Sequence, residues 1–189
     1  MIRSAGQLAS RPGVLIAASA IAWTAAAGAE GPQEYEVKAA FLFNFSKFVE
    51  WPEGAFSEAD RIRFCVLGED PFGPLLEEVV KEKKVNGKEV AVQRVAAVPA
   101  AAGCQVVFIS SSEEPRLEEI LAGLADRPVL TVSEGEAAAA KGAIIGLVLE
   151  ENRVRFEVNV GAARRAKLRL GSQLLRVAVR LVGQSEPGH

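Results

Sequence analysis

The order of apolar and polar positions along the chain predicts strands that alternate with helices. Helical spacing runs from Ala39 to Pro52, and strand-like runs follow at Arg61 to Leu67, Gln105 to Ser110 and Pro128 to Ser133. The inner residues of Gln105 to Ser110 are all apolar, which is typical of a strand buried on both faces. Helical spacing returns between the strands, at Leu75, Leu76, Val79 and Val80 and at Leu117, Ile120, Leu121 and Leu124. This alternation predicts an α/β fold in which helices cover both faces of a mostly parallel sheet.

The pattern changes in the C-terminal part. Ala143 to Leu149 and Arg153 to Val158 flank a short polar segment, which predicts a β-hairpin. Helical spacing from Ala162 to Leu181 predicts one final helix. In the preceding part, right-handed crossovers predict a doubly wound order, in which the strand of Cys65 lies beside the strand of Cys104.

The segment from Ala39 to Pro52 is the most aromatic part of the chain, with four of its nine phenylalanines and one of its two tryptophans. At about 100° per residue, Phe41, Phe45 and Phe48 share the apolar face, which predicts that they pack in the core. Phe43 projects among polar residues instead, so it is a candidate contact residue. The helix therefore fills a core, presents a partner surface, or does both.

The first 29 residues have the character of a secretory signal peptide. Arg3 and Arg11 precede an apolar run from Val14 to Ala27, and small residues form a cleavage site before Glu30. The run is shorter than the roughly 20 residues that a transmembrane helix needs, although an uncleaved anchor is the alternative. We therefore expect an exported, soluble chain of residues 30–189 that forms a single domain.

The overall charge balance argues against nucleic-acid binding, and the charge distribution marks a basic region near the C-terminus. The chain has 22 basic and 24 acidic residues, a balance that does not favour general binding to nucleic acid phosphates. Near the C-terminus, however, Glu157 is the one acid among eight basic residues: Arg153, Arg155, Arg164, Arg165, Lys167, Arg169, Arg176 and Arg180. This region suits an anionic lipid surface or an acidic partner, or it is a solvated helix face. Glu157 itself is expected to form cross-strand ion pairs.

The chain has two cysteines, Cys65 and Cys104. In an exported protein a disulfide between them is the first hypothesis, because disulfides persist in oxidising compartments. The alternative is a pair of buried free thiols.

Residues suited to catalysis are scarce in the sequence. The one histidine, His189, is the last residue, so Ser110 to Ser112 at the end of a predicted strand have no histidine to act as their base. The two cysteines do not have metal-ligand spacing. In the turn from Gly68 to Gly73, two acids would repel a phosphate. We therefore expect neither enzymatic activity nor a cofactor.

Four stretches, in a defined order and spacing, are the most distinctive part of the chain. They are Lys38 to Pro52 (KAAFLFNFSKFVEWP), Phe64 to Gly73 (FCVLGEDPFG), Gly103 to Ser111 (GCQVVFISS) and Asn152 to Leu175 (NRVRFEVNVGAARRAKLRLGSQLL). In these stretches the chain resembles the YfiR-like family of exported bacterial proteins. The resemblance covers nearly all of residues 30–189.

The resemblance implies a periplasmic regulator with a Rossmann-like α/β fold, commonly dimeric. The best-known members restrain an inner-membrane diguanylate cyclase by engaging its periplasmic sensor domain, which lowers cyclic di-GMP and disfavours biofilm. Cys65 and Cys104 match one disulfide pair of the family, and a second pair is missing from this chain. Aromatic and arginine side chains are enriched at contact surfaces, so the candidate partner-contact residues are Phe43, Lys47, Trp51, Arg164, Arg165 and Arg169.

A small-molecule-binding sensor is the alternative function. Such a protein would act in the periplasm with another membrane receptor, such as a histidine kinase. Doubly wound sheets bind ligands beyond the carboxyl ends of their strands. Here those ends include Gly68 to Phe72, Ser110 to Ser112 and Ser133 to Gly135.

Overall fold

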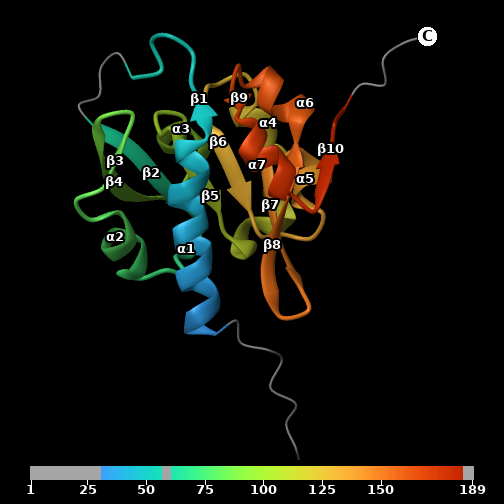
Figure 1. The fold of residues 1–189 in the computed structure, drawn as a ribbon, viewed down its shortest axis with the longest axis horizontal. Coiled ribbons are helices and arrows are strands. Elements are labelled where there is room, and N and C mark those ends of the chain that lie inside the picture. Colours follow the sequence, from blue (N-terminus) through green and yellow to red (C-terminus); the bar gives the residue numbers. More distant parts are fainter. Residues whose placement is uncertain (1–30, 57–60, 185–189) are drawn as a thin grey trace, which may run out of the picture.

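Helices and strands alternate along the chain in the computed structural model, which describes residues 31–56 and 61–184 (Figure 1). In chain order the elements are α1 (Pro32–Lys47), β1 (Val49–Glu50), β2 (Arg61–Leu67), α2 (Leu75–Val80), β3 (Lys84–Val85), β4 (Lys88–Val95), α3 (Val98–Ala101), β5 (Val106–Ile109), the 3₁₀ helix η1 (Ser111–Arg116), α4 (Leu117–Leu124), β6 (Leu130–Ser133), α5 (Ala138–Lys141), β7 (Ile145–Glu150), β8 (Arg153–Asn159), α6 (Val160–Arg165), β9 (Arg169–Leu170), α7 (Ser172–Val177) and β10 (Arg180–Val182). The predicted signal peptide lies outside the described residues. Among the helices described, none has the length and apolar character that a bilayer span requires.

Eight of the described strands form one mostly parallel sheet in the order β10-β8-β7-β6-β5-β2-β4-β3. The pairs β7–β8 and β3–β4 are antiparallel, and the other neighbouring pairs are parallel. The predicted α/β class, the mostly parallel sheet and the β7–β8 hairpin are therefore confirmed. The closer description as a Rossmann-like, doubly wound sheet stays a prediction.

The central strands are buried on both faces. In β2, Phe64 and Val66 pack in a cluster with α1 and α2, whereas Cys65 and Leu67 pack in a second cluster with α3, α4 and α5. None of these four side chains is more than 1% exposed. Because successive side chains of a strand point to opposite faces, each face of the sheet needs its own helices. Figure 1 shows α1 lying across one of these faces.

Helix α1 has a wider buried side than the helical wheel predicts. Phe45 packs against Phe156 of β8 with ring centroids 4.8 Å apart and is buried as predicted, and Phe41 is half-buried. Phe43 is only 9% exposed, because α1 packs against α2 as well as the sheet. The helix ends before Phe48, which is therefore not held on its apolar face and is 36% exposed. The predicted exposure of Phe43 and the predicted core position of Phe48 are wrong.

The C-terminal segment consists of the short elements α6, β9, α7 and β10, so the predicted helix from Ala162 to Leu181 is wrong. Two local features explain the difference. Lys167 has a left-handed φ of 58°, which ends α6. The N–H of Gly171 donates to the backbone oxygen of Phe48 at 2.8 Å, which holds the segment after β9 beside β1.

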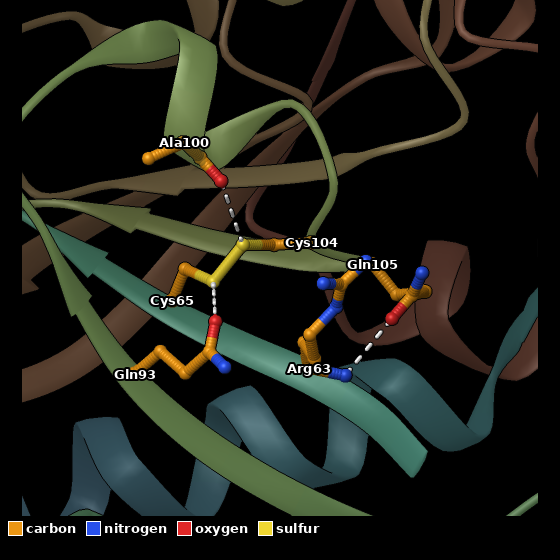
Figure 2. The surroundings of a disulfide bond; sticks show 6 residues. All are labelled: Arg63, Cys65, Gln93, Ala100, Cys104 and Gln105. Atoms are coloured by element: carbon orange, nitrogen blue, oxygen red, sulfur yellow. Dashed lines mark hydrogen bonds between the residues drawn. A yellow bond between two sulfur atoms is a disulfide. The ribbon is translucent and has the colours of Figure 1, made fainter. Parts of the chain in front are cut away.

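A disulfide joins Cys65 of β2 to Cys104, which precedes β5 (Figure 2). The two Cα atoms are 6.1 Å apart, and both residues are buried. β2 and β5 are neighbours in the sheet, as the sequence predicts. Beside the bond, the backbone N–H of Arg63 donates to the side-chain oxygen of Gln105 at 2.8 Å. The predicted disulfide is therefore confirmed, and it links β2 to the chain that enters β5.

Replacing Cys65 and Cys104 together by alanine should lower the free energy of unfolding by about 4 kcal/mol on the chain-entropy model. The physical reason is that the bond constrains the unfolded chain across a sequence separation of 39 residues. Urea unfolding of the oxidised wild type and the double variant measures this difference. A reductant should lower the urea midpoint of the wild type and leave that of the double variant unchanged. Equal urea midpoints for the wild type and the double variant, each with and without reductant, would contradict the prediction.

Candidate partner-binding surface

Strands β1 and β9 bring two distant parts of the sequence together. They pair antiparallel, with Val49 opposite Leu170 and Glu50 opposite Arg169. Arg169 Nε lies 3.6 Å from Glu50 Oε2, and both side chains are exposed. Phe48 stands at the edge of this pair, next to Gly171, whose missing Cβ would lie 3.2 Å from the Phe48 backbone oxygen. A side chain at position 171 would therefore crowd the contact between the two segments.

Trp51 follows β1 and is half-buried. Its ring packs edge-on against Phe56 with centroids 5.5 Å apart. Its Nε1 is buried and has no hydrogen-bond partner among the residues that the structure describes. We call Phe48, Trp51 and Arg169, together with the paired strands β1 and β9, the β1–β9 surface. It has the exposed Phe48 ring before β1, the half-buried Trp51 ring after β1 and the exposed guanidinium of Arg169 on β9.

The other candidate contact residues lie on either side of this surface. Phe43 and Lys47 belong to α1, where the Lys47 and Lys83 ammonium groups stand 5.6 and 4.9 Å from the centre of the Phe43 ring. Arg164 and Arg165 are exposed in the last turn of α6, the helix that precedes β9. The structure thus pairs Arg169 of β9 with Glu50 of β1, packs Trp51 against the core beside these strands, and buries Phe43 where α1 meets α2.

The basic residues near the C-terminus do not form one helix face. Arg180 of β10 is paired across the sheet with Glu157 of β8 and forms an ion pair with it. This confirms the cross-strand pairing predicted for Glu157. The second carboxylate oxygen of Glu157, Oε2, is buried without a hydrogen-bond partner among the described residues. The positive charges are distributed over β8, α6, β9, α7 and β10.

A buried polar cluster, which the sequence patterns did not reveal, anchors α1 at the carboxyl end of the sheet. Lys38 Nζ lies 2.6 Å from Glu134 Oε2 and 2.7 Å from Glu34 Oε1, and the Lys38 and Glu134 side chains are only 4% and 3% exposed. The Tyr35 hydroxyl donates to Glu134 at 3.3 Å, and the Ser111 N–H donates to the other Glu134 oxygen at 3.2 Å. We call these five residues the Lys38 cluster.

One signal in the sequence could have indicated the Lys38 cluster. Glu34 and Lys38 are spaced four apart, which favours an ion pair on a helix. Glu134 directly follows the buried strand β6, where a carboxylate requires a partner. The pairing across α1 and β6 is nonetheless a tertiary contact, which spacing along the chain does not predict.

The carboxyl ends of β2 and β5 carry turn-stabilising interactions. Ser112 Oγ accepts from the Glu69 N–H at 2.9 Å, and Ser110 Oγ accepts from the Ser112 N–H at 3.4 Å. Asp70 accepts from the Phe72 N–H at 2.9 Å within the turn before α2. The serines therefore cap and connect turns. In the ranges that the structure describes, no three histidine, cysteine or acidic side chains are grouped as metal ligands.

Arg94, near the end of β4, stabilises the turn that leads to α2. Its Nε donates to Asp70 at 2.8 Å, its Nη2 donates to the Gly73 carbonyl at 2.6 Å, and it forms a further ion pair with Glu77. The hydrogen bond from Arg94 lowers the pKa of Glu77, against a smaller opposing effect of burial. The same bond raises the pKa of Arg94. The turn is thus held by charge-assisted contacts from a neighbouring strand.

The chain matches a known protein family over most of its length. A family model described as YfiR/HmsC-like matches residues 35–179. The chain belongs to the YfiR/HmsC-like family. The β1–β9 surface, the disulfide and the Lys38 cluster of this YfiR/HmsC-like chain fall inside the matched range, except for Glu34. The family resemblance of the four sequence stretches is therefore confirmed.

The fold of this YfiR/HmsC-like chain is also similar to a solved structure. It is the crystal structure of a conserved domain protein from Vibrio cholerae O1 biovar El Tor strain N16961, with a TM-score of 0.56 and 11% sequence identity. The match covers 78% of this chain and 60% of that chain. At this identity the similarity concerns the fold alone.

Glu134→Gln should destabilise the fold by about 3 kcal/mol, because it leaves the buried Lys38 ammonium with one carboxylate fewer. Glu136→Gln is the matched control, since Glu136 is an exposed residue of the same turn, and it should change stability by less than about 0.5 kcal/mol. Urea unfolding measures both. A double-mutant cycle with Lys38→Met should be strongly non-additive, and simple additivity would show that the two groups are not coupled.

The Arg94–Glu77 pair should make stability depend on pH in one direction. Because the folded pKa of Glu77 lies below its ordinary value of 4.5, the stabilisation is present above that value and is lost as pH falls through the lower folded pKa. The stability difference between wild type and Arg94→Gln should therefore be largest near about pH 7 and shrink toward about pH 3. Both groups are partly exposed, so it should not exceed about 1 kcal/mol. Urea titrations at several pH values test this, and a difference that grows on acidification would contradict it.

Proposed function

We propose that this protein is a periplasmic regulator that binds and restrains an inner-membrane signalling protein, a diguanylate cyclase, and so lowers cyclic di-GMP. Membership of the YfiR/HmsC-like family is the observation that carries the proposal. The residues suited to catalysis are arranged as caps, turns and structural ion pairs in the described part of the chain, which supports a binding role over a catalytic one.

Two features support export to the periplasm. The N-terminal 29 residues have the composition of a signal peptide. The Cys65–Cys104 disulfide is of the kind that persists in an oxidising compartment. The bond joins β2 to the segment that enters the adjacent strand β5, and both cysteines are buried, which supports a structural role for it. We further propose that the protein acts as a homodimer, as its family resemblance implies.

The β1–β9 surface is the proposed centre of the contact with the membrane protein. Phe48 offers an exposed aromatic ring, and Arg169 offers a guanidinium whose partner Glu50 is itself exposed. Aromatic and arginine side chains dominate the energetics of protein contacts. The exposed Arg164 and Arg165 of α6 extend this region. On α1, the exposed Lys47, which precedes Phe48, extends it further, whereas Phe43 is buried.

Restraint of a cyclase requires that the protein bind the inactive arrangement more tightly than the active one. The shift in the cyclase equilibrium cannot exceed this difference in affinity. A rigid surface is suited to such discrimination, because it contributes little ordering cost on binding. The β1–β9 pairing and the Gly171–Phe48 hydrogen bond hold the proposed surface rigidly to the end of α1.

Deleting the gene should raise cyclic di-GMP, and the wild-type gene should restore the lower level. Phe48→Asp should fail to restore it and should weaken binding to the purified periplasmic domain of the cyclase by at least about tenfold, as expected for loss of a central aromatic contact. Binding is measured by calorimetry and the nucleotide by mass spectrometry.

Val177→Asp provides the matched control, because Val177 is an exposed valine of α7, 65% exposed. It should bind and complement like the wild type, and both variants should retain the wild-type circular dichroism spectrum. Unchanged cyclic di-GMP in the deletion strain would reject the cyclase as target. Equal effects of the two substitutions would reject the β1–β9 surface while leaving the regulatory role intact.

A further inference from the structure

A cavity of about 180 Å³ lies where α4, the turn after α5 and α6 meet. Much of its wall is made of buried apolar side chains: Leu121, Leu124, Val129, Ile144, Ala162 and Ala166. The first three belong to the core cluster of α3, α4 and α5, and the others belong to the cluster on the opposite face of the sheet. The cavity therefore lies at the boundary between the two packed layers.

The cavity is distant from the ligand position expected for a doubly wound sheet. Val129 directly precedes β6, and Ile144 directly precedes β7. The cavity therefore lies at the amino ends of these two parallel strands. Ligands of doubly wound sheets are expected at the carboxyl ends instead.

Small residues keep the cavity open. Alanines at 122, 125, 162 and 166 face it together with Gly142. Gly142 has a φ of +117°, which L side chains rarely adopt, so this position of the wall resists substitution by a larger residue. An apolar body placed there would cover part of the apolar wall and remove it from water.

The rim of the cavity is positively charged. Arg165 and Lys141 line it, and Glu118 is the one acid among its lining residues. A second hollow shares Lys141, Gly142 and Arg165 and adds Arg164. Lys141 Nζ lies 3.4 Å from Glu114, and Arg164 donates to the Gly183 carbonyl at 3.3 Å. The Arg165 side chain forms no hydrogen bond or ion pair with another residue of ranges 31–56 and 61–184, and it is exposed, so its guanidinium is available to a ligand.

We infer that this cavity binds a small organic monocarboxylate with an apolar body the size of a single ring. A space of roughly 150 Å³ is large enough for benzene, and the hollow, which is partly open to solvent, combines an apolar wall with a few polar side chains at its rim, as small-molecule sites commonly do. The planar guanidinium of Arg165 suits a carboxylate, because its N–H groups match the two oxygens. Glu118 disfavours a second negative charge on the ligand. The inference does not depend on the proposed regulatory function.

Thermal unfolding of the purified full-length protein tests the inference, with benzoate as the probe. At about 10 mM, benzoate should raise Tm by about 3 °C at constant ionic strength, as expected for millimolar affinity. Benzamide, which has the same shape without the charge, should raise Tm by less than about 1 °C. Phthalate, which carries a second carboxylate, and inorganic phosphate should have no larger effect than benzamide.

Three variants locate the site. Arg165→Gln should reduce the affinity for benzoate at least about tenfold, because it removes the charged partner of the carboxylate. Ala125→Leu fills the cavity from α4 and should abolish the response without lowering Tm. Arg176→Gln, on an exposed residue of α7 that does not line the cavity, should respond like the wild type.

The outcomes separate the inference from its alternatives. Equal shifts with benzoate and benzamide would overturn the role of the carboxylate. A benzoate response that survives both Arg165→Gln and Ala125→Leu would overturn the site. A wild type that shows no response to benzoate at any soluble concentration would overturn the ligand class. None of these results involves a membrane partner, so they are independent of the cyclase experiments.

Discussion

Strand β5 and the last four residues of β2 (64–67) are buried on both faces, and the other elements are arranged around this requirement. Alternate side chains of both strands enter two separate apolar clusters, so the sheet needs two helical layers instead of one layer and one wet face. α1 supplies much of one layer, and its contact with α2 removes Phe43 from solvent. At the start of β5, the disulfide bonds the chain to β2. At the end of β5, Ser111 donates to Glu134, which also binds Lys38 of α1.

The sequence predicted most of what this requirement controls. Continuous apolar runs indicated the doubly buried strands, and their alternation with helices indicated the α/β class and the proximity of Cys65 to Cys104. Predictions based on one helix at a time were less successful. A helical wheel assumes one buried side, whereas α1 has two neighbours, so Phe43 was assigned the wrong environment. The wheel also continued past the end of α1 at Lys47, so Phe48 was assigned to a face that it does not occupy. The final helix was predicted from its apolar spacing, whereas the left-handed φ of Lys167 and the hydrogen bond from Gly171 to Phe48 interrupt it.

The candidate site was predictable in its residue types and not in its assembly. Arginine and aromatic residues suggested a contact surface, but the position of Arg169 beside Glu50 depends on β1 meeting β9, two strands of two residues each with no apolar pattern. The burial of Lys38 depends on Glu134, a residue 96 positions away in the sequence, so no local pattern indicates it. The cavity beneath α6 arises because small residues from separate segments face one another, a property of the three-dimensional packing alone.

The pairing of β1 with β9 joins segments from opposite ends of the described chain. Contacts between residues so far apart in sequence form late in folding, because the intervening chain must be ordered first. Phe48 and Glu50 belong to the N-terminal part of the chain, yet they gain their contacts with Gly171 and Arg169 only after the C-terminal elements have docked. A chain that ends before Leu170 cannot present this surface. Any molecule that recognises it thus selects completed, folded copies, and recognition acts at the same time as a test of the protein's integrity.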